Sequence, residues 1–177
     1  PGLNAVVRGV VARATERHDV EMVGISHNHG DHVGQLPEFA NKPLFVGKPD
    51  FEAAAGKEDD PFVKWRAPGQ PLNAMTGDRD VFGDGNVIAL FLPGHTPGHY
   101  GLLVKLKSGP ILLSGDAAHA REAFQLKAVP TFNTDRNQTL QSMERVEKIA
   151  KDTGAKLVIQ HDDRDIALLP PFPKAAE

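Results

Sequence analysis

Histidine and aspartate residues recur in this sequence at spacings that suit a metal centre. The densest group is the segment Ser26-His27-Asn28-His29-Gly30-Asp31-His32, which follows an apolar, β-branched run at residues 20–26 that predicts a buried strand. Alternate residues of an extended chain project to the same side, so His27 and His29 could bind one metal ion while the following turn directs Asp31 and His32 elsewhere. Imidazole and carboxylate groups are ligands that zinc takes in catalytic sites. The segment therefore predicts a working metal site.

Three more candidate ligands each follow an apolar run farther along the chain. His95 lies in Pro93-Gly94-His95-Thr96-Pro97-Gly98-His99 after the run 87–92, Asp116 lies in Ser114-Gly115-Asp116 after 111–113, and His161 follows 156–160. Loops that follow strand ends commonly carry binding and catalytic residues. We expect His99 to hydrogen-bond or pack at a strand start rather than bind metal.

Composition removes several other classes of function. The chain has 177 residues, a net charge of -3 and no cysteine, which excludes disulfide scaffolds, cysteine nucleophiles and thiolate zinc sites. It lacks the basic excess expected of a nucleic-acid-binding protein and has no apolar run of the ~20 residues that span a membrane. A small-molecule substrate is the expected partner.

The remaining elements can be read from turn residues and periodicity. We expect strands at 43–47 and 100–107, a helix near 50–55 within a long covering segment at 50–80, a hairpin at Asp84-Gly85 and a turn at 108–110. Apolar residues recur with helical spacing from 135 to 152, with Asp135 as the N-cap and Gly154 at the end. Residues 1–19 read as a helix with an apolar stripe.

These motifs, taken in order, resemble the metallo-β-lactamase superfamily from about residue 20 to the C-terminus. The resemblance implies that His27, His29 and His95 bind one zinc ion, that Asp31, His32 and His161 bind a second, and that Asp116 bridges both. Sites of this kind also accept other divalent ions. The implied fold is an α/β (α+β) four-layer αβ/βα sandwich, here a single hydrolase domain over residues 1–177 that is expected to lack its N-terminal strands, because only 26 residues precede His27. The chain begins with Pro1 rather than Met, so we expect a preceding segment to have been removed.

Within the superfamily, the likeness is greatest to the N-acyl homoserine lactone lactonases, which act in quorum quenching. A bridging Asp is typical of such lactonases, glyoxalase II, organophosphate hydrolases and phosphodiesterases, whereas zinc β-lactamases generally lack it. The resemblance implies that a hydroxide bridging the metals attacks the lactone carbonyl and that Asp31 passes a proton to the leaving alkoxide. The cytoplasm and the periplasm both remain open as locations, as does a homodimer.

One residue departs from the lactonase pattern. Lactonases of this type have a Tyr three residues after the bridging Asp, whereas this chain has Asp116-Ala117-Ala118-His119. His119 could donate a hydrogen bond to the substrate in the same role, and organophosphate hydrolases of this fold resemble the chain there. An organophosphate or aryl-ester hydrolase is thus the first alternative, and a β-lactamase or a non-catalytic metal-binding paralogue the second.

Several side chains carry weaker expectations. Asp162 and Asp163 are expected to be solvated, although either could orient His161. Four aromatic residues are candidates for apolar substrate contacts, although core packing is the expected role of each: Phe62, Trp65, Phe124 and Phe132.

Overall fold

The computed structural model describes residues 21–171, so the helix expected over residues 1–19 lies outside the described part of the chain. The chain divides into two compact units, Pro1–Met75 and Thr76–Glu177. Each unit contains its own β-sheet together with helices, as the α+β prediction requires. Among residues 21–171, no helix is long and apolar enough to cross a membrane.

The first unit is built on three parallel strands. Strand β1 (Val23–Gly24) pairs with β2 (Leu44–Gly47), and β2 pairs with β3 (Leu72–Met75). Parallel neighbours need crossover connections, and these contain α2 (Gly30–Val33) with the 3-10 turn η1 (Leu36–Phe39), then α3 (Lys48–Ala53) with η2 (Val63–Arg66). The segment 26–32 therefore leaves the carboxyl end of β1 and runs into α2, so it follows a strand as predicted.

Buried aromatic residues close the core of this unit. Phe62 and Trp65 are almost completely buried with Leu44 and Val46 of β2, and the Trp65 indole Nε1 donates to the Lys42 carbonyl at 2.9 Å. Core packing is thus confirmed for both aromatic residues. The segment 50–80 is also more regular than expected, because β3 lies within it.

The second unit is built on a five-stranded sheet in the order β4 (Arg79–Asp80), β5 (Val87–Phe91), β6 (Tyr100–Leu106), β7 (Gly109–Leu113) and β8 (Lys156–Val158). Strands β4 to β7 are antiparallel neighbours, and β8 is parallel to β7. Strands β5, β7 and β8 therefore run in the same direction, and their carboxyl ends lie on the same side of the sheet. The 108–110 turn is displaced, since Gly109 and Pro110 already pair within the sheet.

The hairpin between β4 and β5 is confirmed, but its loop is longer than an Asp-Gly pair alone would make it. The loop spans residues 81–86, and the Asp80 carboxylate accepts hydrogen bonds from the Gly83 and Gly85 amides at 2.8 and 2.7 Å. Both glycines have positive φ angles. Capture of these amides by Asp80 explains how a six-residue connection stays compact.

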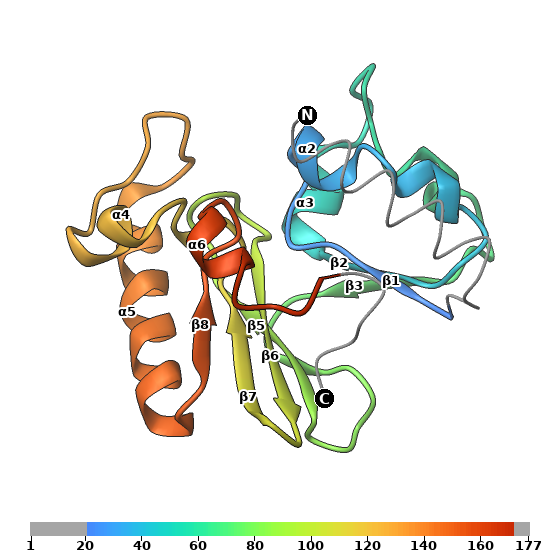
Figure 1. Ribbon diagram of the computed structural model, residues 1–177. Helices are drawn as coiled ribbons and strands as arrows, with labels where there is room; N and C mark the ends of the chain where they lie inside the picture. The colour runs from blue at the N-terminus through green and yellow to red at the C-terminus, as the bar shows by residue number, and fades with distance from the viewer. Residues whose placement is uncertain (1–20, 172–177) are drawn as a thin grey trace. The chain divides into compact units, whose positions relative to one another are not determined.

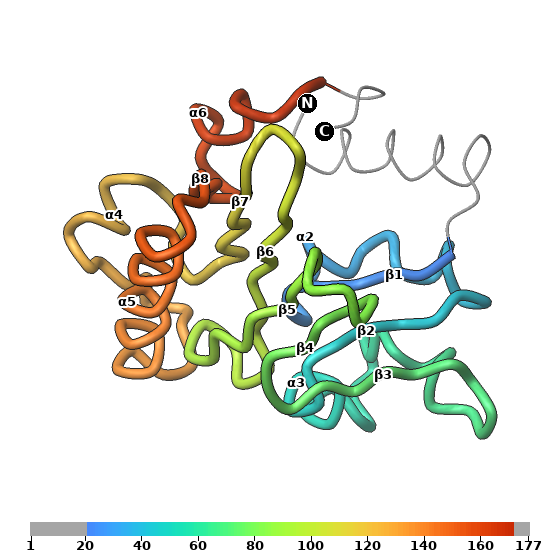
Figure 2. The backbone as a smooth tube through the Cα atoms, turned by 90° about the horizontal axis from the view of Figure 1, so that it is seen from below, coloured from blue at the N-terminus to red at the C-terminus, as the bar shows by residue number. Residues whose placement is uncertain are grey.

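Helix α5 (Arg136–Thr153) packs against this sheet: it runs along the sheet in Figure 1 and lies beside it in Figure 2. Asp135 caps it by accepting from the Gln138 amide at 2.9 Å, and Gly154 ends it with φ = 67°. Val146 packs with Leu90 and Leu112 of the sheet, and Met143 packs with Ala118 and Ile159. Short helices α4 (Arg121–Gln125) and α6 (Asp163–Ile166) flank the segments that carry His119 and His161.

Candidate metal centre

The first unit gathers the histidines of segment 26–32. The ring centroid of His27 lies 4.6 Å from that of His29 and 4.0 Å from that of His32. His27 is buried, whereas Asp31 is exposed and its carboxylate lies 3.5 Å from the His32 Nε2. Within this unit the His27 ring thus lies near both His29 and His32, although the sequence analysis expects the turn to direct His32 away from His27 and His29.

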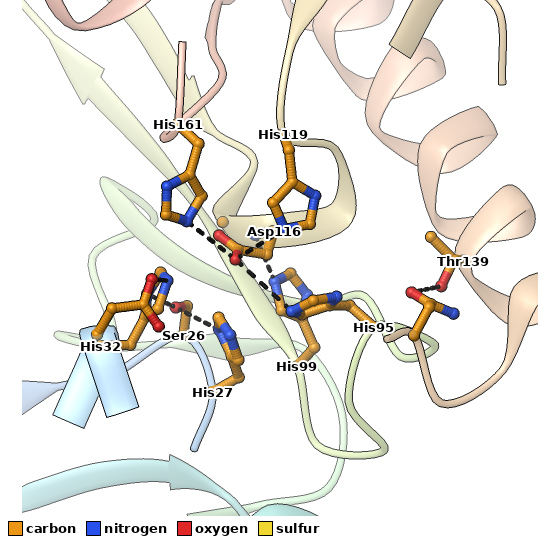
Figure 3. A network of polar contacts seen from close by, with 12 residues as sticks. Ser26, His27, His32, His95, His99, Asp116, His119, Thr139 and His161 are labelled. Carbon is orange, nitrogen blue, oxygen red and sulfur yellow. Dashed lines mark hydrogen bonds and ion pairs between the residues drawn. The ribbon is translucent and has the colours of Figure 1, made fainter. Parts of the chain in front are cut away.

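Ser26 orients two of these rings, a role that sequence reasoning did not assign. Its Oγ lies 3.0 Å from His27 Nδ1 and 3.1 Å from His32 Nδ1 (Figure 3). A hydroxyl carries one proton, so it can donate to only one of these nitrogens and must accept from the other. At least one ring therefore carries its proton on Nδ1 and presents its Nε2 lone pair, as a metal ligand requires. The sign of this role in the sequence is that a hydroxyl residue directly precedes the histidine motif that begins at His27.

The second unit gathers residues from three strand ends around Asp116. His95 follows β5, Asp116 lies in the 3-10 turn η3 (Gly115–Ala117) after β7, and His161 follows β8. The Asp116 Oδ2 lies 3.1 Å from His161 Nε2, 3.2 Å from His119 Nε2 and 3.6 Å from His95 Nε2 (Figure 3). One carboxylate oxygen thus lies among three imidazole nitrogens.

This donor set fits a divalent metal ion. One ligand atom each from His95, Asp116 and His119 lie within 4.8 Å of one another. Asp116 is buried, with its side chain 3% exposed, and a buried carboxylate needs compensating positive charge or hydrogen bonds. Imidazole and carboxylate donors without any thiolate suit zinc and several other divalent ions.

His119 lies beside both a polar and an apolar neighbour. Its ring stacks on that of His161 with centroids 5.3 Å apart, and meets the Phe132 ring edge-on at 5.5 Å. Phe132 is 64% exposed, so the expected core role is wrong for this residue. Phe124, by contrast, is partly buried against two core clusters. The exposed Phe132 face gives the centre an apolar border.

Asp162 is buried, which corrects the expectation that it is solvated. Its carboxylate accepts from the Arg121 amide at 3.0 Å and from the Arg164 amide at 3.1 Å, so it caps α6 and joins the segments that carry His119 and His161. The Arg164 guanidinium and these amides hold the pKa of Asp162 well below its usual range. Asp163, in contrast, is exposed. The sequence offered no sign of this difference, because both residues directly follow His161.

Arg164 extends this connection to α4. Its guanidinium donates to both oxygens of Glu122 at 2.7 Å and also to Asp162. The hydrogen bonds from Arg164 lower the pKa of Glu122 to about 2. Arg121 in turn pairs with the buried Asp165, whose other oxygen accepts from the Ile159 amide at 2.9 Å. The segments carrying His119 and His161 are therefore held together by several charge-assisted hydrogen bonds.

The chain is similar in sequence to proteins of a known family. The metallo-beta-lactamase superfamily model matches residues 8–161. N-acyl homoserine lactonase AttM of Azorhizobium caulinodans is 35% identical over 170 residues, which cover 88% of this chain and 63% of that protein. N-acyl homoserine lactonase AiiA of Bacillus thuringiensis subsp. kurstaki is 32% identical over 149 residues, which cover 83% of this chain and 58% of that protein. The chain thus spans about three-fifths of the length of these curated relatives.

Solved structures agree with the sequence comparison. An N-acyl homoserine lactone hydrolase with N-hexanoyl-L-homoserine bound at its catalytic metal centre is 28% identical, with a TM-score of 0.76 over 89% of this chain and 62% of that one. A quorum-quenching N-acyl homoserine lactone lactonase is also 28% identical, with a TM-score of 0.80 over 96% of this chain and 70% of that one. The superfamily match extends to His161, the last of the candidate ligands, and the backbone agrees over most of the chain. The chain therefore belongs to the metallo-β-lactamase superfamily.

Proposed function

We propose that this chain is a metal-dependent hydrolase that opens the ring of N-acyl homoserine lactones. The observation that carries the proposal is the Asp116 carboxylate, which lies 3.1–3.6 Å from the Nε2 atoms of His95, His119 and His161. Relatives with 35% identity are N-acyl homoserine lactonases, which supports a lactone as the substrate class. In this proposal residues 1–177 act as one hydrolase domain.

The proposed ligand set follows the order of the superfamily motif. His27, His29 and His95 would hold one zinc ion, Asp31, His32 and His161 would hold the second, and Asp116 would contact both. The order of these residues in the superfamily motif supports the assignment, as does the grouping of the histidines within each unit. Two bound ions would supply Lewis acidity and would lower the pKa of water toward ~7.

Two side chains have proposed roles in proton handling and substrate orientation. His119 donates a hydrogen bond to the lactone carbonyl oxygen, a role that its place beside Asp116 and its 26% exposed side chain support. Asp31, whose side chain is 41% exposed, passes a proton to the ring oxygen as the ester C–O bond breaks. The oxygen of water bonds to the carbonyl carbon, the proton that this water gives up is the one that Asp31 accepts and passes to the ring oxygen, and the product is the open hydroxy acid. Phe132 offers an apolar surface for the acyl chain next to His119.

A second candidate is an organophosphate or aryl-ester hydrolase. His119 favours it, because an imidazole in this position can orient a phosphoryl oxygen as well as a carbonyl oxygen. Both reactions need the same metal centre, so a measurement of metal content does not distinguish the two candidate functions. A comparison of substrates on one sample distinguishes them.

The test is a substrate panel on a preparation of known metal content. Zinc per chain is measured by mass spectrometry, and the same sample is assayed with N-hexanoyl-homoserine lactone, paraoxon and a carbapenem. We expect lactone opening to exceed hydrolysis of the other two and to disappear in Asp116→Ala. Asp59→Ala, at an exposed carboxylate, is the matched control and should retain activity. A zinc-loaded chain that hydrolyses paraoxon but not the lactone would favour the second candidate instead.

A further inference from the structure

His99 is completely buried and lies between two segments that end at the metal centre. It directly precedes β6, and its Nδ1 lies 2.9 Å from the carbonyl oxygen of Leu92, the residue that directly follows β5. Its Nε2 accepts a hydrogen bond from the Asp116 amide at 2.8 Å (Figure 3). The imidazole therefore connects the strand end before His95 to the turn that carries Asp116.

The two partners fix the tautomer of His99. A backbone carbonyl can only accept a hydrogen bond, and a backbone amide can only donate one. Nδ1 must therefore carry the proton, and the Nε2 lone pair is occupied by the Asp116 amide. This arrangement gives His99 a different task from His95, four residues earlier.

The backbone around Asp116 is shaped to this ring. Gly115 has φ = 52°, and a Cβ atom on it would lie 2.6 Å from His99 Nε2 and 2.9 Å from the Tyr100 carbonyl oxygen. Asp116 itself adopts φ = -96° and ψ = 22°, outside the helical range of the turn. A glycine at 115 allows the turn to approach the imidazole closely, and the hydrogen bond from Asp116 then holds the turn there.

We infer that His99 is a positioning residue, whose hydrogen bond from the Asp116 amide sets the place of the Asp116 carboxylate and so the metal affinity of the centre. Partners of this kind around metal ligands typically change affinity by ~10–100-fold when removed. The consequence for catalysis rests on the proposed function, but the consequence for metal binding does not. Zinc affinity is therefore the decisive readout.

Two amide substitutions separate the two hydrogen bonds of His99. The side-chain oxygen of His99→Gln reaches the position of Nε2 and can still accept from Asp116. The shorter His99→Asn places its amide nitrogen near Nδ1, where it can donate to Leu92, but leaves Asp116 without its acceptor. Zinc affinity is measured by chelator competition without any lactone present, and folding is checked by circular dichroism and melting temperature. We expect affinity to fall by ~10–100-fold in His99→Asn and to stay within a few-fold of the parent in His99→Gln.

Equal affinities in the two folded variants would overturn the inference, as would a larger loss in His99→Gln. If His99→Asn does not fold, the inference is tested on the unsubstituted protein. Nitrogen-15 NMR then shows which nitrogen of the His99 ring carries the proton before and after zinc is added. A proton on Nδ1 and an unprotonated, zinc-independent Nε2 are expected. A proton on Nε2, or a direct zinc shift of it, would refute the inference. Failure of lactone hydrolysis alone would affect only the proposed function.

Discussion

Gly94→Ala should destabilise the second unit severely, because Gly94 touches the first turn of α5. Gly94 has φ = 131°, and a Cβ atom placed on it would lie 2.2 Å from the Thr139 amide nitrogen and 2.4 Å from Thr139 Oγ1. Its carbonyl oxygen also accepts from the Asp135 amide at 2.8 Å. The residue that precedes His95 is thus docked directly on the helix start.

The expected decrease in the free energy of unfolding of Gly94→Ala has two contributions of similar size. A backbone conformation reserved for glycine costs roughly 1–3 kcal/mol when another residue is forced into it. Overpacking adds roughly 1–3 kcal/mol, since the backbone nitrogen of Thr139 cannot move aside without disturbing α5. Together they predict a decrease of roughly 2–6 kcal/mol in the free energy of unfolding.

Gly109→Ala is the matched control, because Gly109 has a similar φ of 117° but no atom within 4 Å of an added Cβ. Both variants are unfolded in urea with a chelator present, so that metal binding does not contribute to the difference. Gly94→Ala should be less stable than Gly109→Ala by roughly 1–3 kcal/mol, the overpacking part alone. Equal stabilities would refute the argument that close packing on α5 holds the His95 loop.

Three further predictions concern the same unit. Asp135→Ala removes the N-cap of α5 and should lower the free energy of unfolding by about 1 kcal/mol in urea denaturation. Met143→Ala empties a completely buried site and should cost about 2–5 kcal/mol, whereas Gln141→Ala on the exposed face should be nearly neutral in the same measurement. Glu122→Gln should lower the melting temperature at pH 6, and this difference should shrink as the pH falls from 4.5 toward 2. The folded-state pKa of Glu122 is depressed from 4.5 to about 2 by Arg164, so its stabilisation exists above the unfolded pKa and disappears on protonation; a difference independent of pH would contradict this.

Local signals explain which elements could be predicted from the sequence. The range of α5 was predicted to within about a residue, because Asp135 and Gly154 mark its ends in the chain itself. Strand β3 was missed because Leu72-Asn73-Ala74-Met75 contains no β-branched residue and no strict alternation. Its conformation depends on pairing with β2, which is a tertiary contact.

The residues of the candidate site also fall into those with a local sequence signal and those that depend on tertiary contacts. The ligand candidates could be found from their spacing, because each group follows a strand end. Asp162 and Phe132 could not be placed, because burial of the first depends on Arg121, 41 positions earlier, and exposure of the second depends on how the segment before α5 folds. Ser26 and His99 are visible in the sequence as neighbours of the motifs, but the atoms that they contact depend on the folded structure.

We propose that Asp116 organises a two-metal centre that performs lactone hydrolysis. The most direct measurement is zinc per chain, determined after dialysis for the unsubstituted chain, for Asp116→Ala and for the control Asp59→Ala, with lactone opening assayed on the same samples. We expect about two zinc ions per chain and lactone opening in the unsubstituted chain and in Asp59→Ala. We expect Asp116→Ala to lose metal and activity together. An Asp116→Ala chain that retains two zinc ions and normal turnover would contradict this role of Asp116.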